Sequence, residues 1–371
     1  MKKSYQKLLV FQFIIFLILL LNSITTKIVN QYSMCLFLLI LLVVFKMFFG
    51  YEKDRHRYTK SISYDIIIFL LIYFIIYYLF GLIVGYAKTD NYLSIAGITK
   101  VLLPIVIIII EKEILRYMML RKSENNRLLI ITTCLLFIFL DVATILIHTD
   151  FTSKHDSFLF FALTLLPSIS TNISFSYISL KTGYKPGLIY LLVMNLYQYI
   201  IPIIPNPSEY IVSIIKLICP MIVLYIGYKT LKKPKEDLTE RENPILPWLI
   251  PSVITLILVY FISGYFRFQA IAIASGSMSP EIEKGDVVII EKKIDKDKLK
   301  KGMIIAYKYN QRIIVHRLTK IEQYKDTKYY YTKGDANKSA DDYFITEDMI
   351  IGIAEYKIPY IGIPTVWLNE R

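Results

Sequence analysis

A serine-rich bend near the carboxy-terminal end of the sequence carries the residues best suited to chemistry. The bend, Ser275-Gly276-Ser277-Met278-Ser279-Pro280, follows a run from Gln269 to Ala274 whose alternation predicts a strand. Gly276 is expected to allow a sharp bend, and Pro280 to stiffen the exit from it. A serine hydroxyl needs a neighbouring base before it acts as a nucleophile. The bend is therefore either an ordinary turn or the nucleophile segment of a hydrolase.

Only four histidines could supply that base. His56 lies in a basic loop, and His148 and His155 border a short loop between apolar runs, so we expect these three to be solvated loop residues. His316 differs because it follows Ile313, Ile314 and Val315 on a predicted strand. An imidazole that titrates near neutral pH can take and return a proton. His316 is either a partly covered strand residue or the base.

Three aspartates in one later loop could orient the imidazole. Asp335 sits in the turn Lys333-Gly334-Asp335-Ala336-Asn337, where an aspartate often bonds only its own backbone, and Asp341 and Asp342 follow. Spacing alone does not choose among the three. Cys35, Cys134 and Cys219 all lie inside apolar segments, so we expect no disulfide framework, no metal site and no cofactor.

The composition predicts an integral membrane protein. Hydrophobic residues make up 55% of the 371 residues and charged residues 20%, and the mean hydropathy is +0.49, far from the averages of soluble domains. The formal charge of +13 could suggest a nucleic-acid partner. The basic residues instead cluster between apolar runs, as positive-inside topology requires, so we expect membrane lipid and no nucleic acid.

Nine apolar runs approach the length of about 20 residues that a helix needs to cross a bilayer. They cover residues 7–25, 34–50, 65–86, 98–118, 128–147, 157–180, 185–204, 209–230 and 247–266. Every second connecting segment is basic, which predicts a cytoplasmic amino terminus, and an odd number of spans then places the carboxy-terminal region outside the cytoplasm. The first run is too long for a removable signal peptide, so we expect a retained span.

The sequence changes character after the last apolar run. Short apolar runs bounded by polar turns predict strands at Asp286–Ile290, Met303–Tyr309, Arg312–Leu318, Lys328–Thr332 and Ile350–Ile358. We therefore expect a multispanning α-helical membrane region over residues 1–235, a final membrane anchor over 247–266, and a small, mostly β domain over 267–371. The charged segment Lys232–Asn243 is expected to be a cytoplasmic connector.

Several motifs in order resemble the successive boxes of signal peptidase I. They are Ser275-Gly276-Ser277-Met278 with Pro280, Val315-His316-Arg317, the turn at 332–337 with an aspartate at 341, and Ile358-Pro359-Tyr360-Ile361-Gly362. A histidine stands where most bacterial members have a lysine. The chain is therefore similar to the endoplasmic-reticulum and archaeal type, which also occurs in some Gram-positive bacteria. The resemblance covers about the last third of the chain.

The resemblance assigns a role to each candidate residue. It implies that Ser277 is the nucleophile, His316 the general base and Asp341 the third member of the triad, while Asp335 matches a second aspartate that supports the local fold. Ser275 is implied as an oxyanion donor beside the Ser277 amide. Such donors are often worth about 3 kcal/mol each. The implied reaction is acyl transfer in two steps, with Asp342 as an extra acidic neighbour.

The same resemblance implies a biological setting. The chain would be a membrane-bound serine endopeptidase of the cell membrane, with its catalytic domain outside the cytoplasm, that removes signal peptides from exported preproteins. Its partners would be those preproteins, with small residues one and three positions before the cut, and the secretion machinery. Two alternatives stay open: a dedicated maturation protease for a few exported proteins, and an inactive membrane scaffold or transporter that carries a signal-peptidase-like domain.

The apolar region has a fainter likeness of its own. Glu111-Lys112-Glu113-Ile114-Leu115-Arg116 and the run Gly187–Asn195 resemble the glutamate/arginine and histidine/asparagine boxes of CAAX-type intramembrane proteases. The two glutamates are not adjacent, and an apolar residue stands where the histidine is expected. We therefore weigh an inactive homologous fold against a plain membrane anchor whose ionisable residues lie at helix ends.

Overall fold

The computed structural model describes residues 3–25, 31–50, 56, 58–89, 94–232, 245–262, 267–292, 299–310, 312–324 and 327–369. The chain divides into two compact units. We call residues 1–76 and 88–252 the helical unit, and residues 77–87 and 253–371 the β unit. All but the first residue of the expected connector, Lys232–Asn243, lies outside the described residues.

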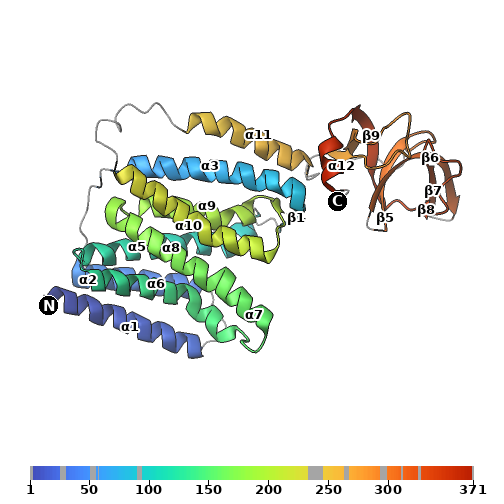
Figure 1. The fold of residues 1–371 in the computed structure, drawn as a ribbon. Coiled ribbons are helices and arrows are strands. Elements are labelled where there is room, and N and C mark those ends of the chain that lie inside the picture. Colours follow the sequence, from blue (N-terminus) through green and yellow to red (C-terminus); the bar gives the residue numbers. More distant parts are fainter. Residues whose placement is uncertain are drawn as a thin grey trace. The chain divides into compact units, whose positions relative to one another are not determined.

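The helical unit is built from long apolar helices that lie side by side (Figure 1). Its elements are α1 (Lys3–Thr25), α2 (Gln31–Phe49), α3 (Thr59–Val84), α4 (Ile95–Gly97), the π-helical turn η1 (Ile98–Leu102), α5 (Leu103–Lys122), α6 (Arg127–His148), α7 (Lys154–Leu159), the π-helical turn η2 (Phe160–Leu165), α8 (Leu166–Thr182), α9 (Lys185–Ile200), β2 (Ile203–Pro205) and α10 (Glu209–Leu231). The last residues of α3 belong to the β unit, as do the first residues of β1 (Tyr86–Lys88), and α11 (Leu246–Ile262) is divided between the units.

Each of the nine expected ranges overlaps one of these helices, although residues 263–266 of the last range lie outside the described residues. Five helical segments in the described part are long and apolar enough to cross a membrane, and a shorter apolar helix covers Pro247–Ile257. The five are Ser4–Leu21, Gln31–Phe49, Thr59–Gly81, Lys154–Thr182 and Glu209–Leu231. The number of spans stays a prediction.

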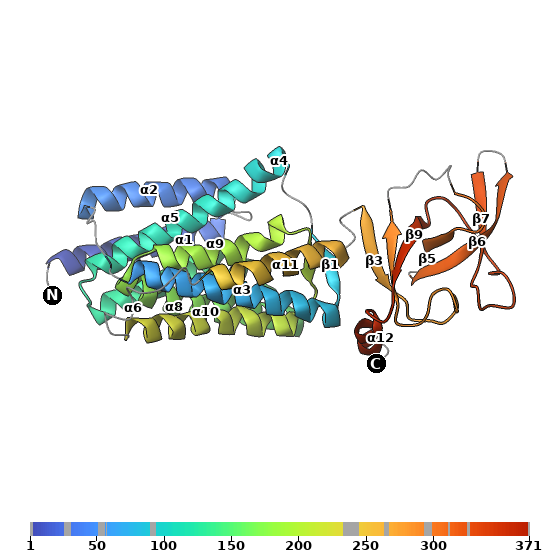
Figure 2. The ribbon, with the colours of Figure 1, turned by 90° about the horizontal axis from the view of Figure 1, so that it is seen from above.

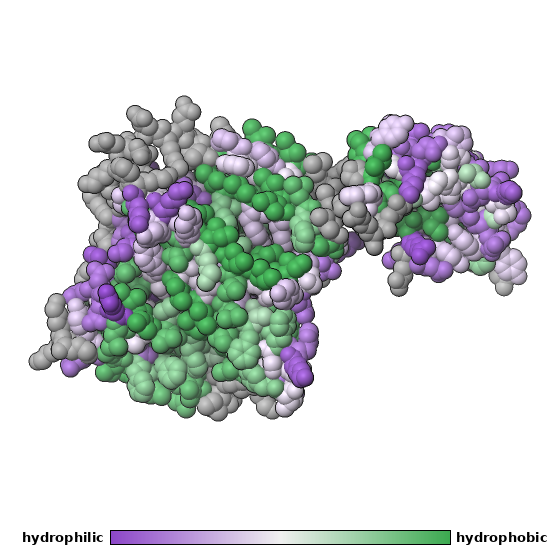
Figure 3. All heavy atoms as spheres, in the orientation of Figure 1, coloured by the Kyte–Doolittle hydropathy of each residue, from purple (hydrophilic) through white to green (hydrophobic). Residues whose placement is uncertain are grey.

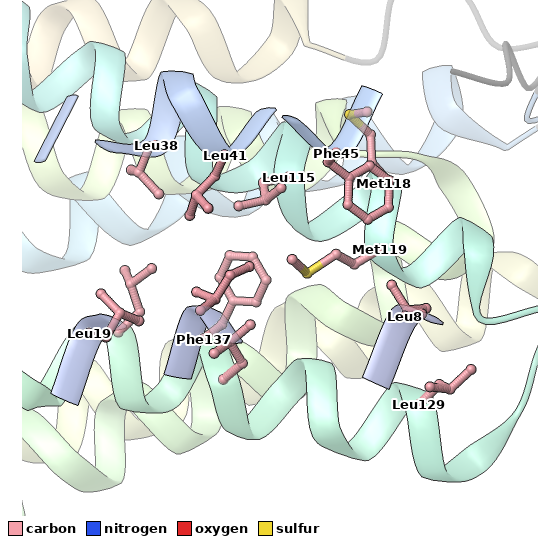
Figure 4. Packing of buried hydrophobic residues seen from close by; sticks show 13 residues of the cluster. Leu8, Leu19, Leu38, Leu41, Phe45, Leu115, Met118, Met119, Leu129 and Phe137 are labelled. Carbon is pink, nitrogen blue, oxygen red and sulfur yellow. The ribbon is translucent and has the colours of Figure 1, made fainter. Parts of the chain in front are cut away.

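Two hydrophobic cores hold the helices together. One joins α1, α2, α5 and α6, and in Figure 4 Leu38 and Leu41 of α2 point toward Leu19 of α1 and Phe137 of α6. The other joins α3, α8, α9 and α10 around Phe175. Large apolar side chains also cover the outside of the helical unit. Figure 3 shows them gathered over its middle, with hydrophilic residues near its two ends, a pattern typical of a lipid-facing surface.

A chain of buried and half-buried polar side chains crosses the interior of the helical unit. Glu113 and Arg116 of α5 are fully buried, with their carboxylate and guanidinium 3.1 Å apart. Arg116 also donates to Asn172 of α8 at 2.5 Å. Asn172 in turn donates to Asp141 of α6 at 2.7 Å, and Asp141 pairs with Lys112 of α5. Because charges in an apolar interior need partners, this network fixes the mutual positions of three helices.

This arrangement corrects the expectation that the ionisable residues of α5 lie at a helix end. Glu111, Glu113 and Arg116 are all buried in the bundle, at 8%, 0% and 0% exposure. The run Gly187–Asn195 approaches the glutamate segment at its start, where a Cβ built at Gly187 would lie 3.4 Å from the Glu113 carboxylate. Asn195 is exposed and bonds the Leu191 carbonyl of its own helix, whereas the amide that contacts Arg116 comes from α8.

The histidine expectations also need one correction. His56 is half-buried, and its Nε2 lies 3.2 Å from the Tyr117 hydroxyl, so it is a packed residue and not a solvated one. Tyr117 lies 61 residues further along the chain, in α5, so the composition of the loop around His56 could not predict this contact. His155 is exposed and lies 3.8 Å from Glu209, and nothing of the His148 side chain is described.

The buried pair predicts an asymmetric response to substitution. Arg116→Met should lower the stability of the helical unit by about 3–5 kcal/mol, because it leaves the Glu113 charge buried without its cation. The double variant Glu113→Gln with Arg116→Met should recover part of that loss. Thermal unfolding of the full chain in detergent measures both. A single variant as stable as the double variant would contradict the pairing.

The β unit is an antiparallel sheet of seven strands that curls on itself (Figure 2). Its elements are β3 (Phe268–Ala272), β4 (Val287–Glu291), β5 (Ile304–Tyr309), β6 (Arg312–Tyr324), β7 (Thr327–Lys333), β8 (Phe344–Ile345), β9 (Ile350–Ile358) and the short helix α12 (Ile363–Asn369). The strand order is β3-β4-β9-β5-β6-β7-β8. All six expected strand segments are confirmed, β6 being six residues longer than its predicted run.

The faces of this sheet bury two separate apolar cores. Met278, Val288 and Val315 belong to the first, and Ile305 and Leu318 belong to the second. Side chains alternate between faces along a strand, so neighbours such as Val315 and His316 turn to opposite sides. The alternation that predicted the strands therefore also decides which residues can meet at a site.

Candidate active site

Two buried anchors hold the segment that carries Ser277. Met278 and Ile282 are 1% and 3% exposed and pack in the first core of the β unit. The Ile282 amide donates to the Met278 carbonyl at 2.9 Å, and the Ser279 amide donates to the Gly276 carbonyl at 3.1 Å, so the segment is a tight, hydrogen-bonded turn. Ser277, directly before Met278, is half-buried. Burial of its neighbour thus fixes the backbone of Ser277.

Gly276 does not play the part expected of it. Its φ is not in the left-handed region, and a Cβ atom built there would meet no atom within 4 Å. The bend therefore does not need glycine for its backbone conformation. Apart from its two chain neighbours, the residue has open space where a side chain would lie.

The carboxy-terminal segment packs against residues 283–286, which follow the serine turn. Gly362 donates to the Gly285 carbonyl at 2.8 Å, and a Cβ at Gly362 would lie 2.9 Å from that oxygen, so only glycine fits this close approach. Asp286 is 2% exposed, and its carboxylate accepts from the Glu283 and Tyr360 amides at 3.0 and 3.2 Å. The box at 358–362 thus holds the residues that lead from the serine turn into β4.

His316 stands in the middle of the sheet. It pairs with Ile305 of β5 on one side, and β6 pairs with β7 on the other. The side chain is 9% exposed, in contact with solvent at little more than its edge. Two neighbouring strands therefore hold the strand on which the imidazole stands.

The three side chains Ser277, His316 and Asp341 form one hydrogen-bonded chain. The Ser277 Oγ lies 3.1 Å from His316 Nε2, and His316 Nδ1 lies 2.8 Å from Asp341 Oδ2. A serine with a base at hydrogen-bond distance, and an acid on the far nitrogen of that base, is the arrangement that activates a serine hydroxyl.

Ser275 lies at the open side of this chain. Its Oγ is exposed and 3.2 Å from the Ser277 Oγ. Within the described residues, the Ser277 backbone amide donates to no acceptor. A hydroxyl and an amide near the same serine are the kind of donors that can hold a developing oxyanion.

The other two aspartates have different surroundings. The Asp335 carboxylate accepts two hydrogen bonds from Arg317, at 2.8 and 2.6 Å, and these bonds hold the pKa of that carboxyl below its usual value. Asp342 is exposed. Of the three candidates that spacing left open, only Asp341 contacts the imidazole in the part of the chain that the structure describes.

The turn that carries Asp335 is itself docked on the serine segment. The Ala336 amide donates to the Ser277 carbonyl at 2.9 Å, and a Cβ at Gly334 would lie 2.6 Å from the same oxygen. Glycine is therefore required at 334 for close backbone approach. The Arg317–Asp335 pair joins this turn to β6, so it ties the strand of His316 to the segment that carries Ser277.

Sequence reasoning missed the second layer of polar residues. It gave no role to Arg317, although that residue follows His316, nor to Tyr307 and Thr332, which both contact Asp341. The strand period could have found Tyr307, because it lies two residues beyond the partner of His316. Among the described residues, no group of three His, Cys, Asp or Glu side chains could hold a metal ion.

The Arg317–Asp335 pair predicts an acid-dependent loss of stability. Because the pKa of Asp335 is lowered in the folded state, its contribution is present above the ordinary carboxyl pKa of about 4 and disappears as the pH falls through the lower, folded value. Asp335→Asn should lower the free energy of unfolding by about 1 kcal/mol near neutral pH. The variant should also lose less stability than the wild type as the pH falls.

Thermal unfolding of the full chain in detergent, followed from neutral to acid pH, measures the effect. Asp342→Asn is the matched control, since it removes an exposed carboxylate of the same loop. An Asp335→Asn profile that parallels the wild-type profile down to the lowest pH would contradict the account.

The fold is a curled β-sheet on which a serine, a histidine and an aspartate form one hydrogen-bonded chain, the arrangement found in serine hydrolases. The comparison with protein families is more specific. Residues 246–352 match the family model described as signal peptidase, peptidase S26.

Individual relatives agree with that family. The chain is 30% identical over 152 residues to the signal peptidase complex catalytic subunit SEC11 of Plasmodium falciparum, covering 38% of this chain and 80% of the relative. It is 24% identical over 184 residues to the sec11 subunit of Schizosaccharomyces pombe, covering 43% and 82%. Signal peptidase I W of Bacillus subtilis is 29% identical over 86 residues, covering 23% and 45%. The chain belongs to the signal peptidase family, and it resembles the endoplasmic-reticulum and archaeal type.

Proposed function

We propose that the protein is a membrane-bound serine endopeptidase that removes amino-terminal signal peptides from exported preproteins. The observation that carries the proposal is the chain of contacts from Ser277 Oγ through both nitrogens of His316 to Asp341, at 3.1 and 2.8 Å. Membership of the signal peptidase family supports the choice of substrate. Ser277 is the nucleophile, His316 the general base and Asp341 the group that orients the base.

The contacts of the imidazole determine how the proton moves. The Nδ1–H donates to the Asp341 carboxylate, which leaves the lone pair of Nε2 facing the Ser277 hydroxyl. As the Ser277 Oγ attacks the carbonyl carbon at the cleavage site, Nε2 takes its proton, and the Asp341 carboxylate stabilises the imidazolium that forms. Asp341 keeps its negative charge throughout.

Attack on the carbonyl forms a tetrahedral intermediate, which breaks down to an ester that water then hydrolyses. The oxygen of the attacked carbonyl becomes negatively charged, and the Ser277 amide and Ser275 Oγ are the donors nearest to it. His316 gives its proton to the leaving amine, which becomes the new amino terminus of the mature protein. An ester between the signal peptide and Ser277 Oγ remains, and a water activated by His316 releases the peptide.

The apolar helices supply the setting for this substrate. We infer nine membrane spans, with residues 1–235 as a membrane region, 247–266 as the final anchor and 267–371 as the catalytic domain outside the cytoplasm. The support comes from the basic residues between spans, the five apolar segments described above and the shorter apolar helix at 247–257. A signal peptide already has its hydrophobic segment in the bilayer, so an anchored enzyme meets it at a fixed depth.

Partners follow from the same reasoning. The two SEC11 relatives are named as catalytic subunits of a signal peptidase complex. We infer that this chain likewise acts on preproteins, with small residues one and three positions before the cut, and works beside the secretion machinery in the cell membrane.

Replacement of the nucleophile tests the proposal. Ser277→Ala should abolish cleavage of a signal-peptide-bearing preprotein by the full chain in membranes, to below about one part in a thousand of the wild-type rate. Ser279→Ala is the matched control, because Ser279 bonds Glu283 and has no contact with His316. The assay follows the shortened product on a gel and sequences its new amino terminus. Normal cleavage by Ser277→Ala would leave an inactive scaffold or transporter as the better account.

A fusion experiment tests the orientation. A reporter that is active only outside the cytoplasm, joined after Arg371, should be active, because an odd number of spans exports the catalytic domain. The same reporter inserted in the basic segment after Lys232 should be inactive. Cytoplasmic behaviour of the reporter after Arg371 would refute the odd number of spans while leaving the chemistry untouched.

A further inference from the structure

We propose that Thr332 and Tyr307 are positioning residues that hold Asp341 against His316, so that the activity of the triad depends on their hydroxyl groups. The inference rests on the proposed function and extends it to two residues outside the Ser277, His316 and Asp341 chain.

One carboxylate oxygen is the centre of the arrangement. Asp341 Oδ2 accepts from Thr332 Oγ1 at 2.6 Å, from Tyr307 OH at 3.2 Å and from His316 Nδ1 at 2.8 Å. The contact from Thr332 has the length of a strong hydrogen bond between a hydroxyl and an ionised carboxylate. An oxygen held by three donors from three strands cannot turn away from the imidazole without breaking the other two bonds.

Burial makes these donors effective. Thr332 and Tyr307 are both fully buried, and the carboxylate itself is only 9% exposed. Burial also raises the pKa of the Tyr307 hydroxyl well above its ordinary value, so it keeps its proton wherever the enzyme would work. Water cannot easily replace either hydroxyl. A substitution that removes one of these hydroxyls would therefore leave the Asp341 carboxylate with one hydrogen bond fewer.

One assignment of protons directs both hydroxyls to Asp341. Tyr343 OH lies 3.0 Å from Tyr307 OH and can donate to it, which leaves the Tyr307 proton for Asp341. Thr332 gives its own proton to the same carboxylate. Each hydroxyl has one proton to donate, and each is used once. Tyr307 OH and Thr332 Oγ1 also lie 3.1 Å apart, and in this assignment no proton lies between them, because both hydroxyls donate to the carboxylate.

Strand register explains why these side chains meet. His316 pairs with Ile305, so Tyr307, two residues along β5, turns to the same face as the imidazole. Leu318, two residues along β6, pairs with Thr332 of β7 and brings it to that face as well. The Asp341 amide donates to the Thr332 carbonyl at 2.9 Å. Thr332 therefore holds Asp341 by both its backbone and its side chain.

Three substitutions in the full chain in membranes test the inference. Thr332→Val keeps the shape but removes the hydroxyl, and it should lower kcat about 10- to 100-fold with KM changed less than about 2-fold. Thr332→Ser restores the hydroxyl and should recover most of that loss. Tyr307→Phe removes the longer bond and should lower kcat about 3- to 10-fold. The measurement is the rate of preprotein cleavage at several substrate concentrations.

The action through Asp341 has its own readout. In an Asp341→Asn background, adding Thr332→Val should cause no further loss, because the charge that it positions is already gone. A structural role would cost the same in both backgrounds. Thermal unfolding of each variant shows whether it folds. If Thr332→Val does not fold, the kcat values of Tyr307→Phe and Thr332→Ser test the inference.

Two outcomes would overturn the inference: Thr332→Val and Tyr307→Phe with the wild-type kcat, or Thr332→Ser as impaired as Thr332→Val. Failure of the proposed function looks different. In that case Ser277→Ala itself would still cleave the preprotein, whatever the Thr332 variants do. If Ser277→Ala folds but is inactive while Thr332→Val is fully active, the positioning role is rejected and the proposed function stands.

Discussion

The antiparallel pairing of β6 with β5 and β7 is the constraint on which the site depends. It places His316 between two neighbouring strands and brings Tyr307 and Thr332 to its face. A slip of one residue would turn all three to the other side of the sheet. The remaining members come from segments that dock on this frame: the serine turn through buried Met278, and the acid loop through the Asp341 amide. A rigid sheet thus orients groups that lie on irregular segments.

The two units treat buried polar groups differently. In the helical unit, the charged residues of the network form two ion pairs within the bundle, Glu113 with Arg116 and Asp141 with Lys112, and Asn172 joins the two pairs. In the β unit, the polar chain ends at a half-buried serine with open space beside Gly276. Opposite charges paired inside a bundle hold helices together, whereas a hydrogen-bonded chain that ends at a partly exposed hydroxyl can accept a substrate. This contrast is why we assign the chemistry to Ser277 and not to the charges of α5.

The sequence predicted most of what depends on local pattern and less of what depends on packing. Apolar runs and strand alternation located the helices and the main strands, because period and length are local signals. The two-residue strand β8 and the short helix α12 were not predicted, because neither is long enough to show a period of hydrophobic residues. The candidate residues came from a bend, a strand and a loop, but their spacing left Asp335, Asp341 and Asp342 equal. The distinction lies in contacts across the sheet, such as those of Arg317 with Asp335 and of Thr332 with Asp341.

The most direct test of the account is the identity of the covalent intermediate. The full chain in detergent is mixed with a preprotein, quenched in acid within the first turnovers and digested, and the peptide spanning the serine turn is analysed by mass spectrometry. We predict an ester that joins the carboxyl end of the signal peptide to Ser277, and none on Ser275 or Ser279, because only Ser277 Oγ lies against His316 Nε2. Acylation at another residue, or cleavage that proceeds with no serine ester at any time after mixing, would contradict the account.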